Sequence, residues 1–342
     1  MLNDKQFLAG LCFNDLEKLL SAYPSFRSRQ IHEWICRGAA FFDDMSSLPK
    51  SLREELEQKF RIHSGEVSSE QKEKDGTVKI GITLEDGAVT ESVLLKDGKD
   101  RKTACLSTQA GCPLGCVFCK TGALGFMRNL TGREIATQFL CLKKREEKLS
   151  HIVIMGMGEP FLNLEELRAA LDFFMESEGL NISKRRITVS TSGIPAGIID
   201  LAANGPDIRL ALSLVTARED LRRRLMPGSG ENLSRVKEAL LVYQEKKARR
   251  VTAEMVLLGG LNTSLEDAKA AREFAKGLGV VFNLIPWNPV PGLEFEGRPL
   301  KVPTPEEINF FAKALESYGL KVTRRMSKGR GISGACGQLG SL

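Results

Sequence analysis

Three cysteines stand close together in the segment GCPLGCVFC, at positions 112, 116 and 119. Thiolates are soft ligands that suit zinc or an iron–sulfur cluster, and the Gly and Pro residues between them favour a loop. A structural zinc site needs a fourth ligand, whereas the next cysteine, Cys141, follows twenty-two residues after Cys119 with no His in between. Three protein ligands on a four-iron cluster leave one iron open to a substrate. We expect Cys112, Cys116 and Cys119 to hold such a cluster.

The segments around these cysteines alternate between short apolar runs and longer amphipathic stretches. The runs that predict strands are TACLST at 103–108, HIVIMGM at 151–157, RITVST at 186–191, IRLALSL at 208–214, VTAEMVLL at 251–258 and VVFNLIPW at 280–287. Strand and helix alternating six times predict an α/β fold with a parallel sheet, built as a full or partial (β/α) barrel or as a doubly wound sheet. In either fold the chemistry is expected at the carboxyl ends of the strands.

Before residue 101 the spacing of apolar residues follows a different pattern. Apolar residues at helical spacing in FNDLEKLLSAY, RQIHEWI and LPKSLREELEQKF predict a small helical domain over residues 1–62. Between 63 and 100, short alternating runs flank Asp86-Gly87, which predicts a β-hairpin connector. The parallel α/β part is then expected over residues 101–342.

Composition excludes several classes of protein. The chain has 342 residues, 42% hydrophobic and 27% charged, and its eight cysteines are far fewer than a secreted disulfide scaffold would hold. The N-terminus MLNDKQFLAG has no basic segment followed by an apolar run, and no apolar stretch reaches the length of a bilayer span. We expect a soluble, cytoplasmic protein with reduced thiols and no membrane partner.

The net charge of +6 is mild, but the cations are clustered. The four clusters are KVTRRMSKGR at 321–330, the arginines 218, 222, 223 and 224, Lys184-Arg185-Arg186, and Lys246, Lys247, Arg249 and Arg250. Although Lys and Arg usually occupy solvated faces, four clusters together make RNA or DNA a candidate partner.

The pattern C-x-x-x-C-x-F-C directly after a strand resembles the radical S-adenosylmethionine (radical SAM) superfamily. Longer segments resemble one family within it, the RlmN/Cfr family of RNA (adenine) methyltransferases, and more closely its RlmN branch. These segments are LSTQAGCPLGCVFCKTGALGFMRNLTGREI, MGMGEPFLN, TVSTSGIP, NLIPWNPVPG and ACGQL. The resemblance implies a partial (β/α)6 radical SAM barrel, an N-terminal helical accessory domain that binds RNA, one [4Fe-4S] cluster, and S-adenosylmethionine used twice per turnover.

The adenine carbons C2 and C8 are electrophilic, so they cannot attack the methyl group of S-adenosylmethionine directly. The resemblance also implies a mechanism that avoids this problem. The thiolate of Cys336, in ACGQL, first takes a methyl group from one S-adenosylmethionine. The cluster cleaves a second molecule reductively, and the 5′-deoxyadenosyl radical takes a hydrogen atom from that methyl group. The methylene radical adds to adenine and joins protein to RNA, until Cys105 attacks the sulfur of Cys336 through a transient disulfide. Glu91 matches the family's proton acceptor, and either Glu91 or Cys105 could remove the ring proton.

The same residue types also have ordinary structural uses. A free cysteine is most often a small buried apolar residue, which is our expectation for Cys12, Cys36 and Cys141. A Glu in a strand, as at position 91, can simply be an exposed side chain.

Polar groups at strand ends match the family's contacts to S-adenosylmethionine. These residues are Gly158, Glu159, Ser190, Ser213, Leu214, Val215 and Asn288. Each also has an ordinary explanation, because Glu is common near helix starts and Ser and Asn populate loops generally.

Two segments depart from the family pattern. Ser213-Leu214-Val215-Thr216 stands where the family usually has Ser-Leu-His-Ala, so the imidazole is missing and Val215 offers only its backbone. Gly-Ile-Ser-Gly at 331–334 replaces the usual acidic residues before Cys336. Both changes bear on the choice of substrate nucleotide.

The predicted activity is methylation of C2 of an adenine in 23S ribosomal RNA, with tRNA as a second candidate substrate. Methylation of C8 and another RNA target are alternatives, and a non-catalytic RNA-binding protein with zinc or an iron–sulfur cluster is the alternative from another class. A non-catalytic RNA-binding protein would have no function for Cys105 and Cys336. A flavodoxin or ferredoxin is expected as electron donor, and the protein is expected to be a monomer.

Overall fold

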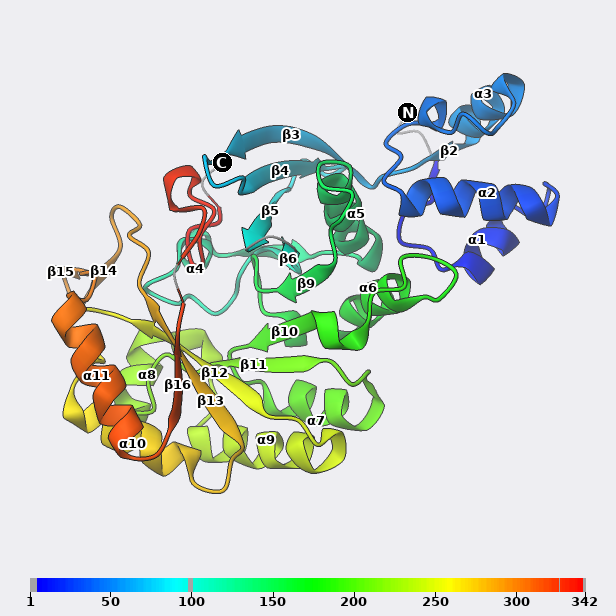
Figure 1. Cartoon of the computed structure of the whole chain (residues 1–342). Helices are drawn as coiled ribbons and strands as arrows, with labels where there is room; N and C mark the ends of the chain where they lie inside the picture. Colours follow the sequence, from blue (N-terminus) through cyan, green and yellow to red (C-terminus); the bar gives the residue numbers. More distant parts are fainter. Residues whose placement is uncertain (1–4, 98–100, 326, 341–342) are drawn as a thin grey trace.

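The computed structural model describes residues 5–97, 101–325 and 327–340. Its main element is a sheet of ten strands in the order β16-β13-β12-β11-β10-β9-β6-β5-β4-β3 (Figure 1). The strands of this sheet are β3 (Gly65–Lys72), β4 (Val78–Leu84), β5 (Val89–Asp97), β6 (Arg101–Leu106), β9 (His151–Ile154), β10 (Ile187–Thr191), β11 (Arg209–Ser213), β12 (Val251–Leu257), β13 (Val280–Pro286) and β16 (Lys321–Arg324). Three two-stranded pairs accompany it: β1 (Gln6–Phe7) with β2 (Phe60–Arg61), β7 (Gln109–Gly111) with β8 (Phe126–Asn129), and β14 (Glu294–Phe295) with β15 (Arg298–Pro299).

Seven neighbouring strands run parallel, from β6 through β9 to β13 and on to β16. Each of the six segments predicted as strands overlaps one of them, and the predicted α/β fold with a partial parallel barrel is confirmed. The sequence did not predict β16, which lies inside the basic cluster 321–330. Its residues are largely exposed because it is the edge strand, so it lacks the apolar pattern of the central strands.

Strands β3, β4 and β5 continue the same sheet in antiparallel fashion, and β5 pairs with β6. The predicted hairpin is confirmed between β4 and β5, where Gly87 adopts a left-handed φ of 82° in the turn. The connector is thus joined to the barrel by main-chain hydrogen bonds.

The helices of the barrel part lie on the outer side of the curved sheet (Figure 1). They are α5 (Gly132–Lys143), α6 (Leu164–Met175), α7 (Pro195–Asn204), α9 (Leu233–Lys247), α10 (Leu265–Ala275) and α11 (Pro305–Ser317). Two shorter helices are α8 (Glu219–Leu225), which follows β11, and α4 (Lys120–Leu124), which lies beside the C-terminal segment. Capping boxes begin α5 at Thr131, α10 at Ser264 and α11 at Thr304, where each hydroxyl accepts a hydrogen bond from the N–H three residues on. Short 3-10 turns cover Pro160–Leu162, Lys184–Arg186, Pro227–Ser229 and Arg330–Ile332.

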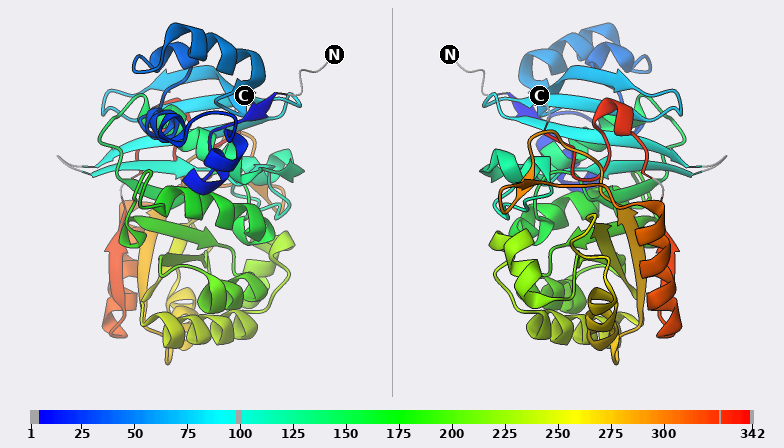
Figure 2. Two further views of the ribbon diagram at one scale, coloured as in Figure 1. Left: turned by 90° about the vertical axis from the view of Figure 1, so that its right-hand side faces the viewer. Right: turned by 90° about the vertical axis from the view of Figure 1, so that its left-hand side faces the viewer.

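The N-terminal residues form the predicted helical unit at one end of the molecule (Figure 2). It contains α1 (Phe13–Leu19), α2 (Ser25–Cys36), α3 (Lys50–Lys59) and a 3-10 turn at Phe42–Asp44. Glu176, which follows α6, accepts hydrogen bonds from the backbone N–H of Phe13 at 2.6 Å and pairs with Nε2 of His32 at 3.1 Å. These contacts connect the helical unit to the barrel. Within the described residues, no helix has the length and apolar character needed to cross a membrane.

Candidate active site

The three clustered cysteines lie on the loop between β7 and α4, beside the carboxyl ends of the parallel strands. The N–H of Cys112 donates to the carbonyl of Gly125 at 2.8 Å, and the N–H of Val117 donates to the carbonyl of Leu225 at 3.1 Å. Gly111 has a φ of 78°, and a Cβ there would collide with the carbonyl of Gly125. The loop therefore needs glycine where it leaves β7, and backbone bonds fix its course.

The three thiols line one cavity of about 170 Å³. Burial raises the pKa of Cys112 to about 11, and it also raises the pKa of Cys116 and of Cys119. Three buried thiols are costly to ionise together unless a cation lies between them, which the irons of a cluster supply. Among the described residues, no group of three or more His, Cys, Asp or Glu side chains is arranged to hold a single metal ion. The donor set fits a [4Fe-4S] cluster, in which each thiolate binds a different iron.

The loop after β9 forms a second side of this cavity, lined by Gly158 and Glu159. Gly158 has a φ of 98°, and a Cβ there would lie 2.6 Å from the side chain of Gln109. The buried carboxylate of Glu159 accepts hydrogen bonds from Oγ1 of Thr191 at 2.7 Å and from the N–H of Ser192 at 2.7 Å. Burial raises its pKa. The sequence did not single out Gln109, Thr191 or Ser192, although they hold this loop in place.

Ser190 and Ser213 line the same cavity from the ends of β10 and β11, and their hydroxyl oxygens are 3.1 Å apart. Two of the predicted cofactor contacts lie outside the cavity lining: Leu214 is fully buried in the core, and the side chain of Asn288 bonds the C-terminal segment.

Val215, which stands where the family usually has His, also lines the cavity. It has a φ of 62°, a left-handed conformation that is rare for a β-branched residue. Its N–H donates to the carbonyl of Glu254 at 3.1 Å, and its carbonyl accepts from Nδ2 of Asn262 at 2.9 Å. Both backbone groups that Val215 was expected to offer have partners within the protein, and its side chain belongs to a buried apolar cluster beside the cavity.

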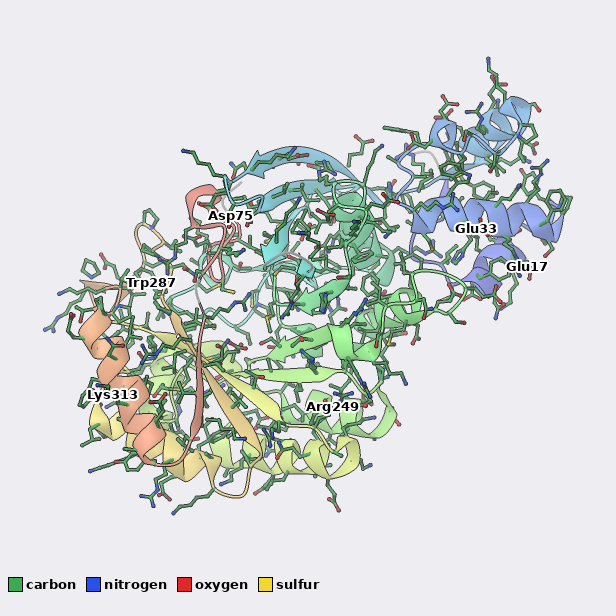
Figure 3. All side chains as sticks on the ribbon, viewed as in Figure 1. Glu17, Glu33, Asp75, Arg249, Trp287 and Lys313 are labelled. Carbon is green, nitrogen blue, oxygen red and sulfur yellow. The ribbon has the colours of Figure 1, made fainter. Side chains whose placement is uncertain are left out.

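The C-terminal segment carries Cys336 over the open side of the barrel. The carbonyl of Cys336 accepts a hydrogen bond from Nδ2 of Asn288 at 2.9 Å, and the carbonyl of Gly337 accepts one from the N–H of Lys120 at 2.7 Å. Trp287, labelled in Figure 3, follows β13 and donates from Nε1 to the carbonyl of Phe118 at 2.9 Å. The segment is therefore tied both to the cysteine loop and to the end of β13.

Cys336 lines the cluster-side cavity and also a larger one of about 710 Å³ in the barrel interior, which Cys105 on β6 lines as well. Burial, together with the neighbouring Cys336, raises the pKa of Cys105 to about 12. Two cysteines that are 231 positions apart in the sequence are thus brought to one cavity, next to the predicted cluster ligands.

Glu91 is not an exposed strand residue, since its side chain is only 1% exposed. It pairs with the buried Lys79 at 3.0 Å, and it is absent from the described residues that line the two cavities. Its role as proton acceptor stays a prediction.

The other cysteines lie elsewhere. Cys12 precedes α1, Cys36 ends α2 and Cys141 lies within α5. Burial raises the pKa of each, to about 11, 12 and 11 respectively, in keeping with packed thiols.

Arg222, one of the clustered arginines considered as RNA or DNA contacts, is buried. Arg222 is 2% exposed and donates to the carbonyl of Leu214 at 3.3 Å and to Oγ of Ser229 at 3.1 Å, so it cannot serve a polyanion at the surface. Its position beside Leu221 and three residues before Leu225, both buried, is the pattern that could have indicated this.

Comparisons with known proteins show the family to which the chain belongs. Residues 106–274 match the radical SAM superfamily, and residues 8–62 match the family described as ribosomal RNA large subunit methyltransferase N-terminal domain. Among similar proteins, the probable dual-specificity RNA methyltransferase RlmN of Treponema denticola is 46% identical over 98% of this chain and 96% of its own. The dual-specificity RNA methyltransferase RlmN of Lawsonia intracellularis is 41% identical over 97% of this chain and 96% of its own.

A crystal structure of a radical SAM methyltransferase from Sphaerobacter thermophilus superposes with a TM-score of 0.92 at 38% identity, over 97% of this chain and 98% of the other. The similarity therefore extends over nearly the whole chain.

Proposed function

Because the chain belongs to the RlmN family of radical SAM methyltransferases, we propose that it methylates C2 of an adenine in 23S ribosomal RNA, with tRNA as a second substrate. The relatives are named as RNA methyltransferases of dual specificity and match this chain over nearly its full length, which supports RNA as the substrate. The preference for C2 over C8 rests on the segments MGMGEPFLN and PWNP, which look more like the RlmN branch.

The observation that carries the proposal is the meeting of Cys105 and Cys336 in one cavity beside the cysteine loop. Cys336 reaches the cavity on the last segment of the chain, and Cys105 reaches it from the first strand of the barrel. A protein that only bound RNA through a metal-containing fold would have no use for this pair. A methyl carrier and a second thiol that frees the product require it.

The residues at the strand ends would hold the cofactors. Cys112, Cys116 and Cys119 would bind the cluster, and Gly158, Glu159, Ser190 and Ser213 offer the polar groups that face S-adenosylmethionine. When bound, the cluster and S-adenosylmethionine supply the methyl group and the hydrogen-abstracting radical, with two S-adenosylmethionine molecules consumed per turnover. The expected electron donor is a flavodoxin or ferredoxin, and the expected form is a monomer.

The larger cavity is the proposed entry for the RNA nucleotide. Arg101, Arg209 and Arg324 line it and are exposed, so they can meet phosphates around a base that reaches Cys336. Within the cavity, the amide Nδ2 of Asn283 donates to Oε2 of Glu254 at 2.6 Å and offers a polar edge to a base. A base must leave its stack to reach this depth.

In the proposed reaction, Cys336 and Cys105 make and break the following bonds. Cys336 gains a methyl group, loses one hydrogen atom from it and bonds the ring carbon through the resulting methylene radical. The ring then loses a proton and one electron, and the cluster held by Cys112, Cys116 and Cys119 would accept that electron when bound. The thiolate of Cys105 attacks the sulfur of Cys336, a disulfide forms, and the departing carbon takes a proton to become the RNA methyl group.

The burial of Cys105 predicts a steep pH dependence for this last step. Because burial raises the pKa of Cys105, only a small fraction of the thiol is ionised at pH 7, and this fraction rises with pH. The rate of Cys105–Cys336 disulfide formation in a single turnover should therefore rise with pH from 7 to 9 without a plateau. Non-reducing peptide mass spectrometry of quenched samples measures it, and a rate that levels off below pH 8 would contradict this assignment.

The function is tested by anaerobic reconstitution and by nucleoside analysis. The reconstituted protein should hold four irons and, with reductant, convert S-adenosylmethionine to 5′-deoxyadenosine, whereas Cys116→Ala should lose both. Ribosomal RNA and tRNA from cells with and without the gene should differ in 2-methyladenosine. A difference in 8-methyladenosine instead would select the C8 alternative. If the protein bound zinc and did not cleave S-adenosylmethionine, the proposed radical mechanism would be wrong.

A further inference from the structure

Arg222 on α8 connects three segments beside the candidate active site from a buried position. It is 2% exposed, and its guanidinium group donates to the carbonyl of Leu214 at 3.3 Å, to Oγ of Ser229 at 3.1 Å and to the carbonyl of Ser192. The planar guanidinium group holds several acceptors in fixed directions, which the compact ammonium group of lysine does not. Three segments that are separate in the sequence are therefore fixed to one side chain.

The charge of Arg222 has no carboxylate partner in direct contact. Arg224 on the same helix pairs with two carboxylates, whereas no ion pair of the described residues includes Arg222. A buried charge is costly unless an anion compensates for it. Burial lowers the pKa of Arg222, and the largest opposing effect comes from Cys116, followed by Glu219 and Glu159. Glu219 is exposed, so the buried groups that can balance the charge are Cys116 and Glu159.

Helix α8 and the turn after it support the cysteine loop. The N–H of Val117 donates to the carbonyl of Leu225 at 3.1 Å, and the N–H of Gly228 donates to the carbonyl of Leu114 at 2.9 Å. Leu225 belongs to a buried apolar cluster with Phe118, and two of the three clustered cysteines pack against it. The course of the cysteine loop therefore depends on the position of α8.

The acceptors of Arg222 lie at the ends of two strands that face the cavity. Ser192 directly follows β10, and its N–H donates to Oε2 of Glu159 at 2.7 Å while its carbonyl accepts from Arg222. Leu214 directly follows Ser213, the last residue of β11. One side chain thus joins the support of the cysteine loop to the strand ends that would face S-adenosylmethionine.

We propose that Arg222 is a positioning residue for the radical step, which fixes the support of the cysteine loop to the ends of β10 and β11 and whose charge favours the reduced cluster. The proposal rests on the proposed function, because that function places the cluster on Cys112, Cys116 and Cys119. One-electron reduction by dithionite, or by the expected flavodoxin or ferredoxin, adds a negative charge to a group that three thiolates already make anionic. A buried positive charge nearby stabilises this state, since net charge is one determinant of a cluster's potential.

Three variants separate the hydrogen bonds of Arg222 from its charge. Arg222→Lys keeps a positive charge but loses the planar arrangement of donors. Arg222→Gln loses the charge and keeps an amide with two N–H donors. Arg235→Gln on α9 is the matched control, because Arg235 is exposed and its replacement changes the net charge by the same amount as Arg222→Gln.

The first readout is hydrogen exchange at the amides of Val117 and Gly228, measured in the full chain with and without the cluster. Exchange should be about tenfold faster in Arg222→Lys and in Arg222→Gln, because neither side chain can hold all three acceptors and the support of the loop opens more often. Arg235→Gln should exchange at the parental rate.

The second readout is the one-electron reduction potential of the reconstituted cluster, from a dithionite titration followed by electron paramagnetic resonance. Arg222→Gln should lower the equilibrium constant for reduction about tenfold, which corresponds to about 59 mV. Arg222→Lys keeps the charge and should stay within about threefold of the parent. Arg235→Gln should match the parent, because water and salt screen an exposed charge.

Parental exchange at Val117 and Gly228 in folded Arg222→Gln protein would overturn the proposal, because Arg222 would then not hold the support of the loop. A potential that falls as far in Arg222→Lys as in Arg222→Gln would also overturn it, because the charge would then have no effect on the cluster. Equal potentials in Arg222→Gln and Arg235→Gln would have the same consequence.

A milder variant covers the case in which Arg222→Gln does not fold. Ser229→Ala removes one acceptor of the guanidinium group and should speed exchange at Gly228 severalfold, so a parental rate there would contradict the proposal. If the parent protein binds no four-iron cluster, the proposed function fails, while exchange in the cluster-free chain still tests whether Arg222 holds the support of the loop.

Discussion

Replacement of Cys336 by alanine is expected to abolish RNA methylation, with a loss of at least about 1,000-fold, because no other group can carry the methyl carbon into the ring. Cys336 lines both cavities, and the backbone of its segment is fixed independently of the thiol by Asn288 and Lys120. The variant should therefore fold normally. Peptide mass spectrometry should show one added methyl group on the Cys336 peptide of the parent protein and none in the variant.

The matched control for this variant is Cys141→Ala. Cys141 is buried in α5 and lines neither cavity, so its substitution removes a thiol that has no part in the proposed reaction. It should keep full methylation of RNA. Continued methylation of RNA by Cys336→Ala would contradict the role of Cys336 as carrier.

Replacement of Cys105 by alanine is expected to stop the reaction one step later. Cys336 should still accept the methyl group and add to the RNA base, but the adduct cannot be opened by a second thiol. A covalent protein–RNA species should accumulate to about one per active enzyme, visible as a slowly migrating band in a denaturing gel that nuclease and protease each remove. Product should fall by at least about 100-fold.

The control for the trapped adduct is the double variant Cys105→Ala/Cys336→Ala, which should form none. Free methylated RNA from Cys105→Ala at the parental rate would show that another group resolves the adduct. Because Cys105 packs in an apolar cluster with Val93 and Leu339, alanine at this position leaves a small void, and the melting temperature should be recorded alongside.

Much of the site could be predicted from sequence because its signals are local or tied to strand ends. The three cluster cysteines fall within eight residues, Gly158 follows an apolar run that predicts a strand, and Ser190 and Ser213 lie near the ends of two others. Parallel strands bring their carboxyl ends to one edge of the sheet, so these groups had to lie together. The pairing of Cys105 with Cys336 came from the resemblance, since their separation in the sequence carries no geometric information.

The missed features depend on contacts between distant segments. Lys79 lies in the apolar strand β4, and its partner on the next strand bonds a residue 249 positions farther on, which no local pattern reveals. The left-handed backbone of Val215 follows from its bonds to Glu254 and Asn262. Strand β16 lacks an apolar alternation because it lies at the edge of the sheet, where pairing with β13 alone makes it a strand.

The most direct test of the methylcysteine mechanism uses S-adenosylmethionine that carries a trideuterated methyl group. Passage through Cys336 removes one deuterium as the methylene radical forms and later adds one solvent hydrogen, so the methyl group on the RNA should retain two deuterium atoms and 5′-deoxyadenosine should gain one. Mass spectrometry of the digested RNA reads this directly. A methyl group that arrives with all three deuterium atoms would show direct transfer and contradict the account.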